Sequence, residues 1–585
     1  MVTELIKTIE DIYNILFEPI DSLYKLTAIE NYKQRLNLKE DERFGDYYSK
    51  YAEGEKSTGV VYTPKEMASY IVKNTINEED IIKNPYIKIV DPSCGSGNLT
   101  IQCYNYLKEI YVGNLNTINE KNNLVLREDQ IDEHILKNNL YGFDIDNMAI
   151  KVLVIDLFLA TGYLINENFY NADFLIEESD VKFDIFIGNP PYVGQKSIEK
   201  SYSSRLKQLY KNIYKDKGDL SYCFFQASLN RLNKGGKITF ITSRYFLEAP
   251  SGCELRKTLK ETCSIYRIVD FYGIRPFKGV GIDPLIIFLT NALDFQDNIE
   301  TIKPLYSKGK EKKQFYNSVF LENGNEYSKF TVNKNVLSSS GWILIDNFKR
   351  NIINKIERKC ITNLANVCSS YQGIITGCDK AFVVNSSIIK ANNLEKDIIK
   401  PWIKSSYIGK NTLELEDNYL IYADLIESKE THPNCIDFIS TYKEKLIKRR
   451  ECEKGIRKWY ELQWGRKQQL FESSKIIFPY KSSNNRFYKD KGSYFSADVY
   501  SLILNEDAPF TYEYLLFLLN SKTYEFYFKT FAKKLGEDLY EYYPNNLMKL
   551  CIPTMFLEAE YDEDKLYQLF EFTEEEKKII NDSIS

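Results

Sequence analysis

Histidine is almost absent from this chain, with two residues, His134 and His432, among 585. The 11 cysteines are scattered and include no C-x-x-C pair. These shortages disfavour a zinc site, a disulfide framework and a nucleophile that histidine activates. We therefore expect no metal site, and we expect the reduced thiols of a cytoplasmic protein.

Long apolar runs are also missing, and none approaches the roughly 18 residues of a membrane span. The N-terminus lacks the basic region and the apolar stretch of a signal peptide. We therefore expect no membrane association. The net charge is -5, so binding to nucleic acid would require a local basic surface.

Six short apolar runs alternate with helical patterns or long connections, which predicts an α/β fold with a doubly wound, mainly parallel sheet. The predicted strands are residues 87–90, 139–146, 183–188, 237–242, 266–271 and 285–289. The length of the chain predicts several domains. We divide it into a helical lead-in (1–56), an α/β domain (57–300), a connecting segment (301–355), a second domain (356–555) and an acidic helical tail (556–585).

A glycine-bearing turn, Asp91-Pro92-Ser93-Cys94-Gly95-Ser96-Gly97-Asn98, follows the first predicted strand. Such a turn lets the backbone approach a ligand closely at the carboxyl ends of parallel strands. Asp144 ends the second predicted strand, where an acidic side chain usually holds ribose hydroxyls. The turn lacks G-x-G-x-x-G spacing and no G-K-[ST] follows, so dinucleotide and ATP binding are disfavoured.

The tetrapeptide Asn189-Pro190-Pro191-Tyr192 follows the third predicted strand. Its two prolines have no N–H for a strand ladder, and they stiffen the loop. The loop thereby holds an amide side chain, two carbonyls and an aromatic ring in a fixed relation. This arrangement suits the binding of a planar group that carries an amine, and it indicates methylation of an exocyclic amine.

Residues 443–467 form the densest basic stretch of the second domain, with ten Lys or Arg against four Glu. A solvated helix face is the usual explanation of a charge run. Interleaved large aromatics favour instead a surface that contacts nucleic-acid phosphates. The candidate DNA-binding residues are Lys448, Arg449, Arg450, Arg457, Lys458, Trp459, Tyr460, Trp464 and Arg466.

In their order along the chain, the motifs strongly resemble those of amino-methyltransferases that use S-adenosylmethionine. More narrowly, they are similar to DNA adenine-N6 methyltransferases whose target-recognition domain follows the catalytic domain, above all to the orphan clostridial enzymes. The resemblance covers about residues 57–550. Its motifs are Y-T-P (62–64), the glycine turn, Y-G-F-D-I-D (141–146), N-A-D-F (171–174), N-P-P-Y, K-G-D-L (217–220), R-P-F (275–277) and Y-Q-G-I-I-T-G-C-D-K-A-F (371–382).

This resemblance implies a Rossmann-like catalytic domain and a mixed α+β target-recognition domain, monomeric on duplex DNA at the bacterial nucleoid. The implied cofactor-binding residues are Tyr62, Thr63, Asp91, Ser93, Cys94, Gly95, Gly97, Asn98, Asp144, Ile145, Asp173, Phe174 and Asn189. The Asn189 side-chain oxygen and the Pro190 carbonyl would accept the two N6 hydrogens of a flipped-out adenine. Tyr192 would stack on one face of that base, and Phe277 on or near the other.

Four other interpretations are weighed against this one. N-P-P-Y also occurs in methyltransferases that act on protein glutamine or on RNA bases, and cytosine-N4 methylation would favour Ser in place of Asn189. A restriction–modification fusion would need a nuclease, for which we find neither room nor a P-D…E-x-K set. A non-catalytic DNA-binding protein should have lost Asn189 or the glycine turn. The residues favour an adenine methyltransferase without a nuclease domain.

Overall fold

The computed structural model describes residues 2–39, 42–52, 62–215, 218–277, 281–292, 297–305, 312–535, 539–554 and 561–584. Lys217 of the K-G-D-L motif and the segment just ahead of Y-T-P lie outside these residues. The chain divides into two units, Met1–Leu344 and Ile345–Ser585. Their boundary falls inside the segment that the sequence marks as connecting. Among the described residues, no helix is long and apolar enough to cross a membrane.

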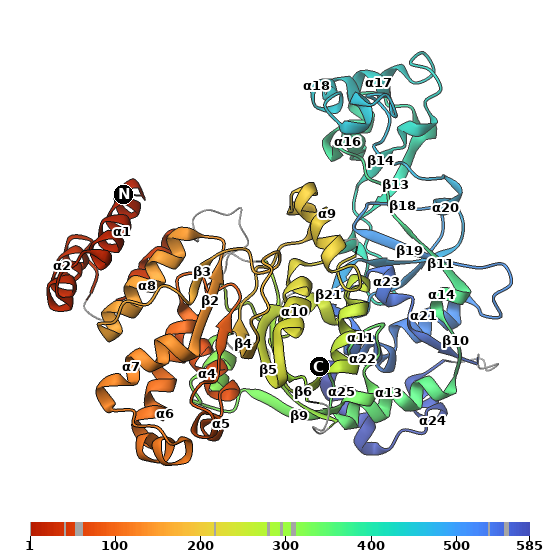
Figure 1. Cartoon of the computed structure of the whole chain (residues 1–585). Helices are drawn as coiled ribbons and strands as arrows, with labels where there is room; N and C mark the ends of the chain where they lie inside the picture. Colours follow the sequence, from red (N-terminus) through yellow and green to blue (C-terminus); the bar gives the residue numbers. More distant parts are fainter. Residues whose placement is uncertain are drawn as a thin grey trace. The chain divides into compact units, whose positions relative to one another are not determined.

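The first unit is built on a nine-stranded sheet with the order β3-β2-β1-β4-β5-β7-β6-β8-β9 (Figure 1). Its strands are β1 (Ile89–Asp91), β2 (Leu140–Asp144), β3 (Phe169–Asn171), β4 (Phe183–Gly188), β5 (Leu232–Ser243), β6 (Ser264–Asp270), β7 (Pro284–Thr290), β8 (Asn298–Pro304) and β9 (Tyr327–Asn333). All six strands predicted from apolar runs are present. The strands β3, β8 and β9 were not predicted.

Strands β3, β2, β1, β4 and β5 are parallel neighbours, and so are β6 and β8. Strand β7 is antiparallel to both β5 and β6, and β9 is antiparallel to β8. The prediction of a mainly parallel sheet is therefore confirmed. The connecting segment is not a separate element, because β8 and β9 extend this sheet.

The strand order reverses between β1 and β4, because the chain leaves β1 for β2 and β3 and then crosses to the other side of β1. Ligands of open α/β sheets bind at such a switch point, outside the carboxyl ends of the strands. Asp91 ends β1, and Asn189 follows β4 directly. The fold thus brings the glycine turn and N-P-P-Y to the position where a ligand is expected.

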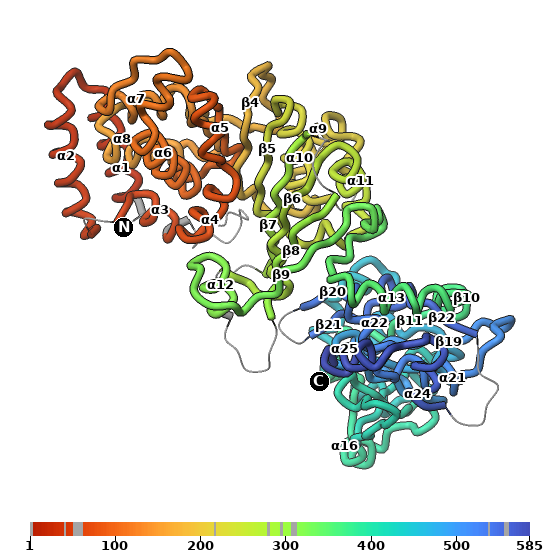
Figure 2. Tube along the Cα trace, turned by 90° about the horizontal axis from the view of Figure 1, so that it is seen from below, coloured from red at the N-terminus to blue at the C-terminus, as the bar shows by residue number. Residues whose placement is uncertain are grey.

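Helices cover both faces of this sheet, as alternating strand residues require. In β7, Ile286 and Phe288 join one apolar core, and Leu285, Ile287 and Leu289 join the other. The first core contains residues of α4 (Lys65–Thr75), α6 (Asn98–Asn122) and α8 (Asn147–Thr161). The second contains residues of α9 (Lys200–Leu209), α10 (Leu220–Arg231) and α11 (Cys253–Thr262). Figure 2 shows these two groups on opposite sides of β4–β7.

The lead-in consists of α1 (Val2–Phe17), α2 (Ser22–Arg35) and α3 (Phe44–Ala52). Leu5, Ile9 and Ile12 recur on one face of α1 and are buried in the first core. Two backbone N–H groups at the start of α3, those of Phe44 and Gly45, donate to the Asp156 carboxylate of α8 at 3.0 and 2.8 Å. The lead-in is therefore part of the first unit.

The second unit contains four small sheets, β10-β22, β11-β19-β15-β17, β12-β14-β13-β18 and β16-β21-β20. The strands are β10 (Cys360–Asn363), β11 (Cys368–Gln372), β12 (Val383–Val384), β13 (Ile399–Ile403), β14 (Tyr419–Ile421), β15 (Lys475–Pro479), β16 (Lys481–Ser482), β17 (Tyr488–Asp490), β18 (Tyr494–Phe495), β19 (Val499–Leu504), β20 (Lys533–Lys534), β21 (Tyr540–Glu541) and β22 (Cys551–Pro553).

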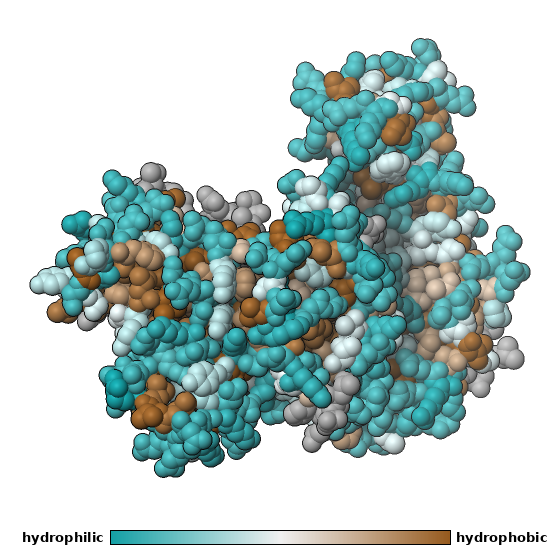
Figure 3. Space-filling model, in the orientation of Figure 1, coloured by the Kyte–Doolittle hydropathy of each residue, from teal (hydrophilic) through white to brown (hydrophobic). Residues whose placement is uncertain are grey.

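The helices of the second unit surround these sheets, and its longer ones are α13 (Asn347–Lys359), α17 (Pro433–Ser440), α21 (Tyr512–Asn520), α22 (Lys522–Phe531) and α25 (Glu574–Ile584). The acidic tail packs on this unit, since Leu566, Phe570 and Ile580 are fully buried. The face drawn in Figure 3 is mostly hydrophilic, with hydrophobic colour in small separate patches. The second unit combines these helices with the four small sheets and has its own apolar core, so it is a mixed α+β structure.

A substitution at Gly97 would show how tightly the glycine turn is packed. Its φ is +88°, and a Cβ there would lie 2.3 Å from Cδ1 of the buried Leu153. We expect Gly97→Ala to lower the free energy of unfolding by about 2–4 kcal/mol, through backbone strain and overpacking. Urea unfolding measures this change. Gly113→Ala is the matched control, since a Cβ at Gly113 meets nothing within 4 Å. Equal stabilities of the two variants would contradict the prediction.

Candidate active site and nucleic-acid interface

The glycine turn ties the ends of β1 and β2 together. Asp91, the last residue of β1, is buried, and its Oδ1 accepts a hydrogen bond from the Ser93 N–H at 3.0 Å. The N–H of Gly95, whose φ is +51°, donates to Oδ2 of Asp144 at 2.8 Å. Asn98 then starts α6, and its side chain donates to the Thr63 carbonyl at 3.2 Å. The predicted cofactor residues Thr63, Asp91, Gly95, Asn98 and Asp144 thus lie in one connected group.

Two acidic groups face each other here without a cation. Burial raises the pKa of Asp91 to about 8, and the nearby Asp144 adds to this effect. Burial likewise raises the pKa of Asp144. Within the described residues, no Lys or Arg forms a salt bridge with either carboxyl, and the buried Ser93 hydroxyl has no hydrogen-bond partner. A cationic ligand would compensate this charge, because an opposite charge favours the ionised carboxylate.

The Asn189 side chain is held from both ends. Its Nδ2 donates to Oγ1 of Thr63 at 3.3 Å, and its Oδ1 accepts from the Tyr192 hydroxyl at 2.5 Å. Both partners are hydroxyl groups, and in this structure the amide oxygen faces Tyr192 while the amide nitrogen faces Thr63. Thr63, which the resemblance assigns to cofactor binding, therefore also positions Asn189. The Y-T-P segment and N-P-P-Y meet in space although 126 residues separate Thr63 from Asn189.

The loop after N-P-P-Y is fixed to the start of α10. The Leu220 N–H donates to the Val193 carbonyl at 3.0 Å, and Gly194 bridges to Asp219. Tyr192 is 7% exposed, and burial raises the pKa of its hydroxyl well above the usual value. The neutral Tyr192 hydroxyl donates a hydrogen bond to the Asn189 side-chain oxygen. The G-D-L part of K-G-D-L thus holds the loop that follows N-P-P-Y.

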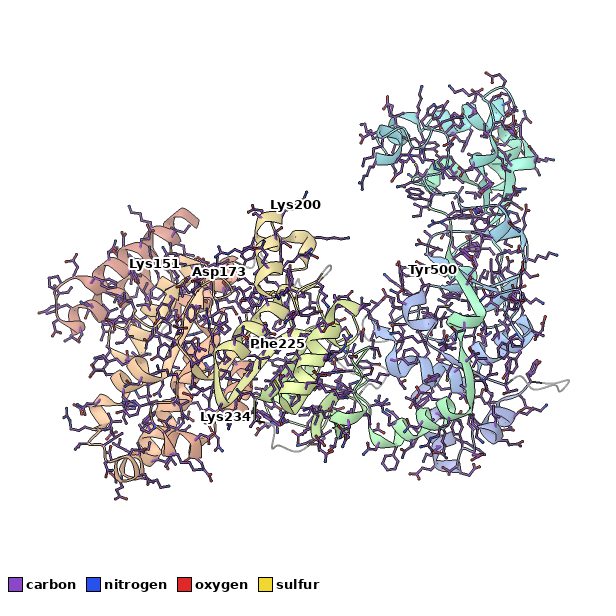
Figure 4. All side chains as sticks on the ribbon, turned by 45° about the vertical axis from the view of Figure 1, so that its right-hand side comes forward. Lys151, Asp173, Lys200, Phe225, Lys234 and Tyr500 are labelled. Atoms are coloured by element: carbon purple, nitrogen blue, oxygen red, sulfur yellow. The ribbon has the colours of Figure 1, made fainter. Side chains whose placement is uncertain are left out.

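The N-A-D-F segment follows β3. Oδ1 of Asp173 accepts from the Leu175 N–H at 3.0 Å, and Oδ2 accepts from the Tyr202 hydroxyl at 2.7 Å. Asp173 lies at the upper edge of the first unit in Figure 4. Phe174 is only 2% exposed and stacks on Phe224 in the second core. The structure therefore corrects the expectation that its ring faces a cofactor.

Four other predicted site residues differ in how deeply they are buried. Phe277 is 7% exposed and belongs to the first apolar core, as Tyr192 does. The resemblance places this ring on or near the target base, whereas in the structure it packs in the core. Cys94 is buried, Tyr62 is half-buried, and Ile145 is 77% exposed at the end of β2.

The lead-in contributes contacts that sequence reasoning missed. The Tyr48 hydroxyl of α3 donates to Oδ2 of Asp146 at 2.6 Å, and the Asp146 N–H donates to Oδ1 of Asp144 at 2.8 Å. The hydroxyls of Ser49 and Ser96 lie 3.2 Å apart. Helix α3 thereby supports the glycine turn and the end of β2 at once. Its only sequence signal is an amphipathic pattern, which names no partner.

In the second unit, the structure buries two of the predicted DNA contacts. Arg449 is 9% exposed, and its guanidinium donates to the carbonyls of Leu446 and Thr376 at 3.1 Å and of Trp459 and Glu461 at 2.9 Å. Tyr460 is buried as well. Neither side chain is available to a phosphate, contrary to expectation. Arg449 instead fixes the loop that carries the other candidates.

The remaining basic candidates lie at the surface. Lys448, Arg450, Lys458 and Arg466 are exposed, and Trp464 is 38% exposed. Arg457 pairs with Asp424 at 3.1 Å, and Trp459 packs under Lys443 and Lys429. Trp464 pairs through its backbone with Ile375 of the Y-Q-G-I-I-T-G motif. The basic stretch and that motif therefore form one surface.

Parts of both units match described families. Residues 138–277 match the Eco57I restriction-modification methylase, residues 79–175 the DNA-methyltransferase domain of MmeI, and residues 400–552 the TaqI-like C-terminal specificity domain. This chain resembles type II restriction-modification methyltransferases. The Eco57I match contains Asp144 and N-P-P-Y, and the MmeI match contains the glycine turn and Asp144. The TaqI-like match contains the basic stretch.

Curated relatives extend the similarity to most of the chain. Type II methyltransferase M.BstVI of Geobacillus stearothermophilus is 23% identical over 85% of this chain and 90% of its own length. Type II methyltransferase M.BanIII of Aneurinibacillus aneurinilyticus is 25% identical over 77% of this chain and 82% of its own length.

Two solved restriction–modification enzymes share the fold. The DNA complex of MmeI matches with a TM-score of 0.55 and 14% identity, over 80% of this chain and 64% of that one. A nuclease-deletion mutant of LlaGI matches with a TM-score of 0.53 and 15% identity, over 92% of this chain and 60% of that one. The chain thus spans less than two thirds of the length of these two structures.

The raised pKa of Asp91 predicts a pH dependence of stability. The folded carboxyl keeps its proton up to about pH 8, whereas the unfolded one loses it near 3.8, so this contribution to stability falls as the pH rises between these values. We expect Asp91→Asn to remove up to about 1.4 kcal/mol per pH unit from that slope. Urea unfolding at pH 5 to 8 measures it. Parallel curves for the two proteins would refute the prediction.

The burial of Arg449 makes a matched pair with its exposed neighbour Arg450. We expect Arg449→Met to destabilise the protein by about 2–4 kcal/mol, because it leaves several buried carbonyls without a donor. Arg450→Met should change stability by less than about 0.5 kcal/mol. Thermal and urea unfolding separate the two. Wild-type stability of Arg449→Met, with weaker DNA binding, would show that this guanidinium contacts phosphate after all.

Proposed function

We propose that the protein is a site-specific DNA methyltransferase that transfers a methyl group from S-adenosylmethionine to N6 of an adenine flipped out of duplex DNA. The observation that carries this proposal is the Asn189 amide. It follows β4 at the switch point of the sheet, and hydrogen bonds to Thr63 and Tyr192 hold its two ends. The family matches on both units support the same activity.

The acidic group at the ends of β1 and β2 suits S-adenosylmethionine, which carries an ammonium and a sulfonium. Asp91 and Asp144 lack a counter-cation within the described residues and would gain one from this cofactor. Asp144 would accept from the ribose hydroxyls and Asp173 from the adenine amine. Tyr62, Ser93, Cys94, Gly97, Asn98 and Ile145 would complete the pocket. When bound, the cofactor supplies an electrophilic methyl group.

The chain's own contribution is to position and polarise the target amine. The Asn189 oxygen and the Pro190 carbonyl would accept the two N6 hydrogens, which draws the nitrogen lone pair out of conjugation with the ring. An amide oxygen can accept two hydrogen bonds, so the Tyr192 hydroxyl and the substrate can share it. Pro191 would stiffen the loop, and Tyr192 would stack on the base. Preorganised acceptors and orientation then provide the catalysis.

The substrate follows from the second unit and from Asn189. Lys448, Arg450, Arg457, Lys458, Trp459, Trp464 and Arg466 would bind duplex DNA, and asparagine at position 189 favours adenine over cytosine. The protein would act as a monomer in the cytoplasm at the nucleoid. Methylation of RNA or protein glutamine is the alternative. A recognition unit matching a TaqI-like specificity domain favours DNA.

The decisive variant is Asn189→Ala. We expect it to lower tritiated methyl transfer to duplex DNA by at least about 100- to 1,000-fold, since it removes a preorganised acceptor. Binding of S-adenosylmethionine, measured by calorimetry, should stay within about threefold of the wild type. Asn105→Ala, an exposed asparagine on α6, is the matched control and should keep full activity. Methyl transfer by Asn189→Ala at a rate near that of the wild type would contradict the proposed mechanism.

Long-read sequencing of DNA from cells that express the protein identifies the modified base directly. We expect N6-methyladenine at one short sequence. Methylcytosine, or modification confined to RNA or protein, would contradict the proposed substrate.

A further inference from the structure

A second basic surface lies in the first unit, immediately after N-P-P-Y. Residues 196–215 contain six Lys or Arg and one Glu, within a chain of net charge -5. The family motifs do not include this segment. Its core is helix α9, which is separated from Tyr192 by a short turn of 3-10 helix (Gln195–Ser197).

The charges of this segment point to solvent. Lys196, Lys200, Arg205 and Lys211 are exposed. The opposite face is apolar and is buried in the second core, through Leu206, Tyr210, Ile213 and Tyr214. Lys215 pairs with Glu254 at 3.0 Å. Lys200, Arg205 and Lys211 make no salt bridge with any residue that the structure describes. Their charge is therefore available to a partner.

The segment is anchored beside the candidate cofactor site. The Tyr202 hydroxyl of α9 donates to Asp173 at 2.7 Å, and the Tyr210 hydroxyl donates to the Leu175 carbonyl at 2.6 Å. Figure 4 shows Lys200 on the same edge of the unit as Asp173, with Lys234 on the opposite edge. The unpaired cations thus stand at the carboxyl edge of the sheet, where N-P-P-Y also lies.

We propose that the exposed basic face of α9, with Lys211 after it, binds the DNA phosphates that flank the flipped-out nucleotide. This inference rests on the proposed function. Leaving the stack costs unstacking energy, and phosphate contacts on either side of the nucleotide would position the backbone for it; cations next to the base pocket can make those contacts. Helix α9 is about 15 Å long, the axial length of about four phosphates of one strand. Tyr202 then links the phosphate-binding helix to Asp173.

The test compares two triple variants that remove the same charge. The first is Lys200→Gln, Arg205→Gln and Lys211→Gln. The control is Lys73→Gln, Lys121→Gln and Lys234→Gln, three exposed lysines on α4, α6 and β5. Each protein is titrated with a fluorescent 30-base-pair duplex containing the methylated sequence, at several salt concentrations, with circular dichroism to check folding.

We expect the α9 variant to bind the duplex at least tenfold more weakly at low salt. The slope of log K against log salt should become shallower by about 0.9 for each lost contact, so by up to about 2.7. The control should follow the wild type. Cofactor affinity should change less than twofold in both, because the substitutions leave Tyr202 and Asp173 in place.

Other outcomes would overturn the inference. A wild-type slope in the α9 variant would mean that its basic face is only solvated. Equal losses in both triple variants would mean a general effect of charge. Weaker binding of transfer RNA or anionic vesicles with unchanged duplex binding would assign the surface to another polyanion. Failure of the wild type to methylate DNA would instead refute the proposed function, and the slope comparison would still decide the role of α9.

Discussion

The orientation of one amide governs what this site can do. The oxygen of Asn189 accepts hydrogen bonds and its nitrogen donates them, so a half-turn about the side chain would present donors to a substrate amine. In the structure the oxygen faces the Tyr192 hydroxyl and the nitrogen faces Oγ1 of Thr63. Thr63 reaches Asn189 only because α4 packs against β4 and β5 of the sheet. The position of the Asn189 amide therefore depends on how α4 packs against the sheet.

Much of the fold could be predicted from local signals. Apolar runs marked β1, β2, β4, β5, β6 and β7, and a turn with two left-handed glycines leaves a clear trace in the sequence. The direction of β7 could not be predicted, since alternating burial is the same for parallel and antiparallel strands. Strands β8 and β9 lie in a polar segment of the chain, where no apolar run marks them. Their pairing with the sheet edge depends on long-range contacts that composition does not encode.

The candidate site was predictable where motifs sit at strand ends, and less so where burial decides. A basic stretch with interleaved aromatics suggests that these side chains lie at the surface. Arg449 is instead buried and donates to four carbonyls from three segments of the chain. Phe277 is likewise buried, in the first apolar core. The charges of α9 are plain in the sequence, but their place beside Asp173 follows from one tyrosine contact. The same holds for Tyr48, which supports Asp144 through Asp146.

The dependence of α3 on Asp156 also has a consequence for how the chain is made. The Phe44 N–H and its acceptor are 112 residues apart. At ordinary rates of translation, the helix leaves the ribosome roughly 6 to 22 s before the carboxylate that caps it. During that interval α1, α2 and α3 have no sheet to cover, and their apolar faces are exposed to chaperones. The part of the first unit that is synthesised first thus waits for α8 before it can pack.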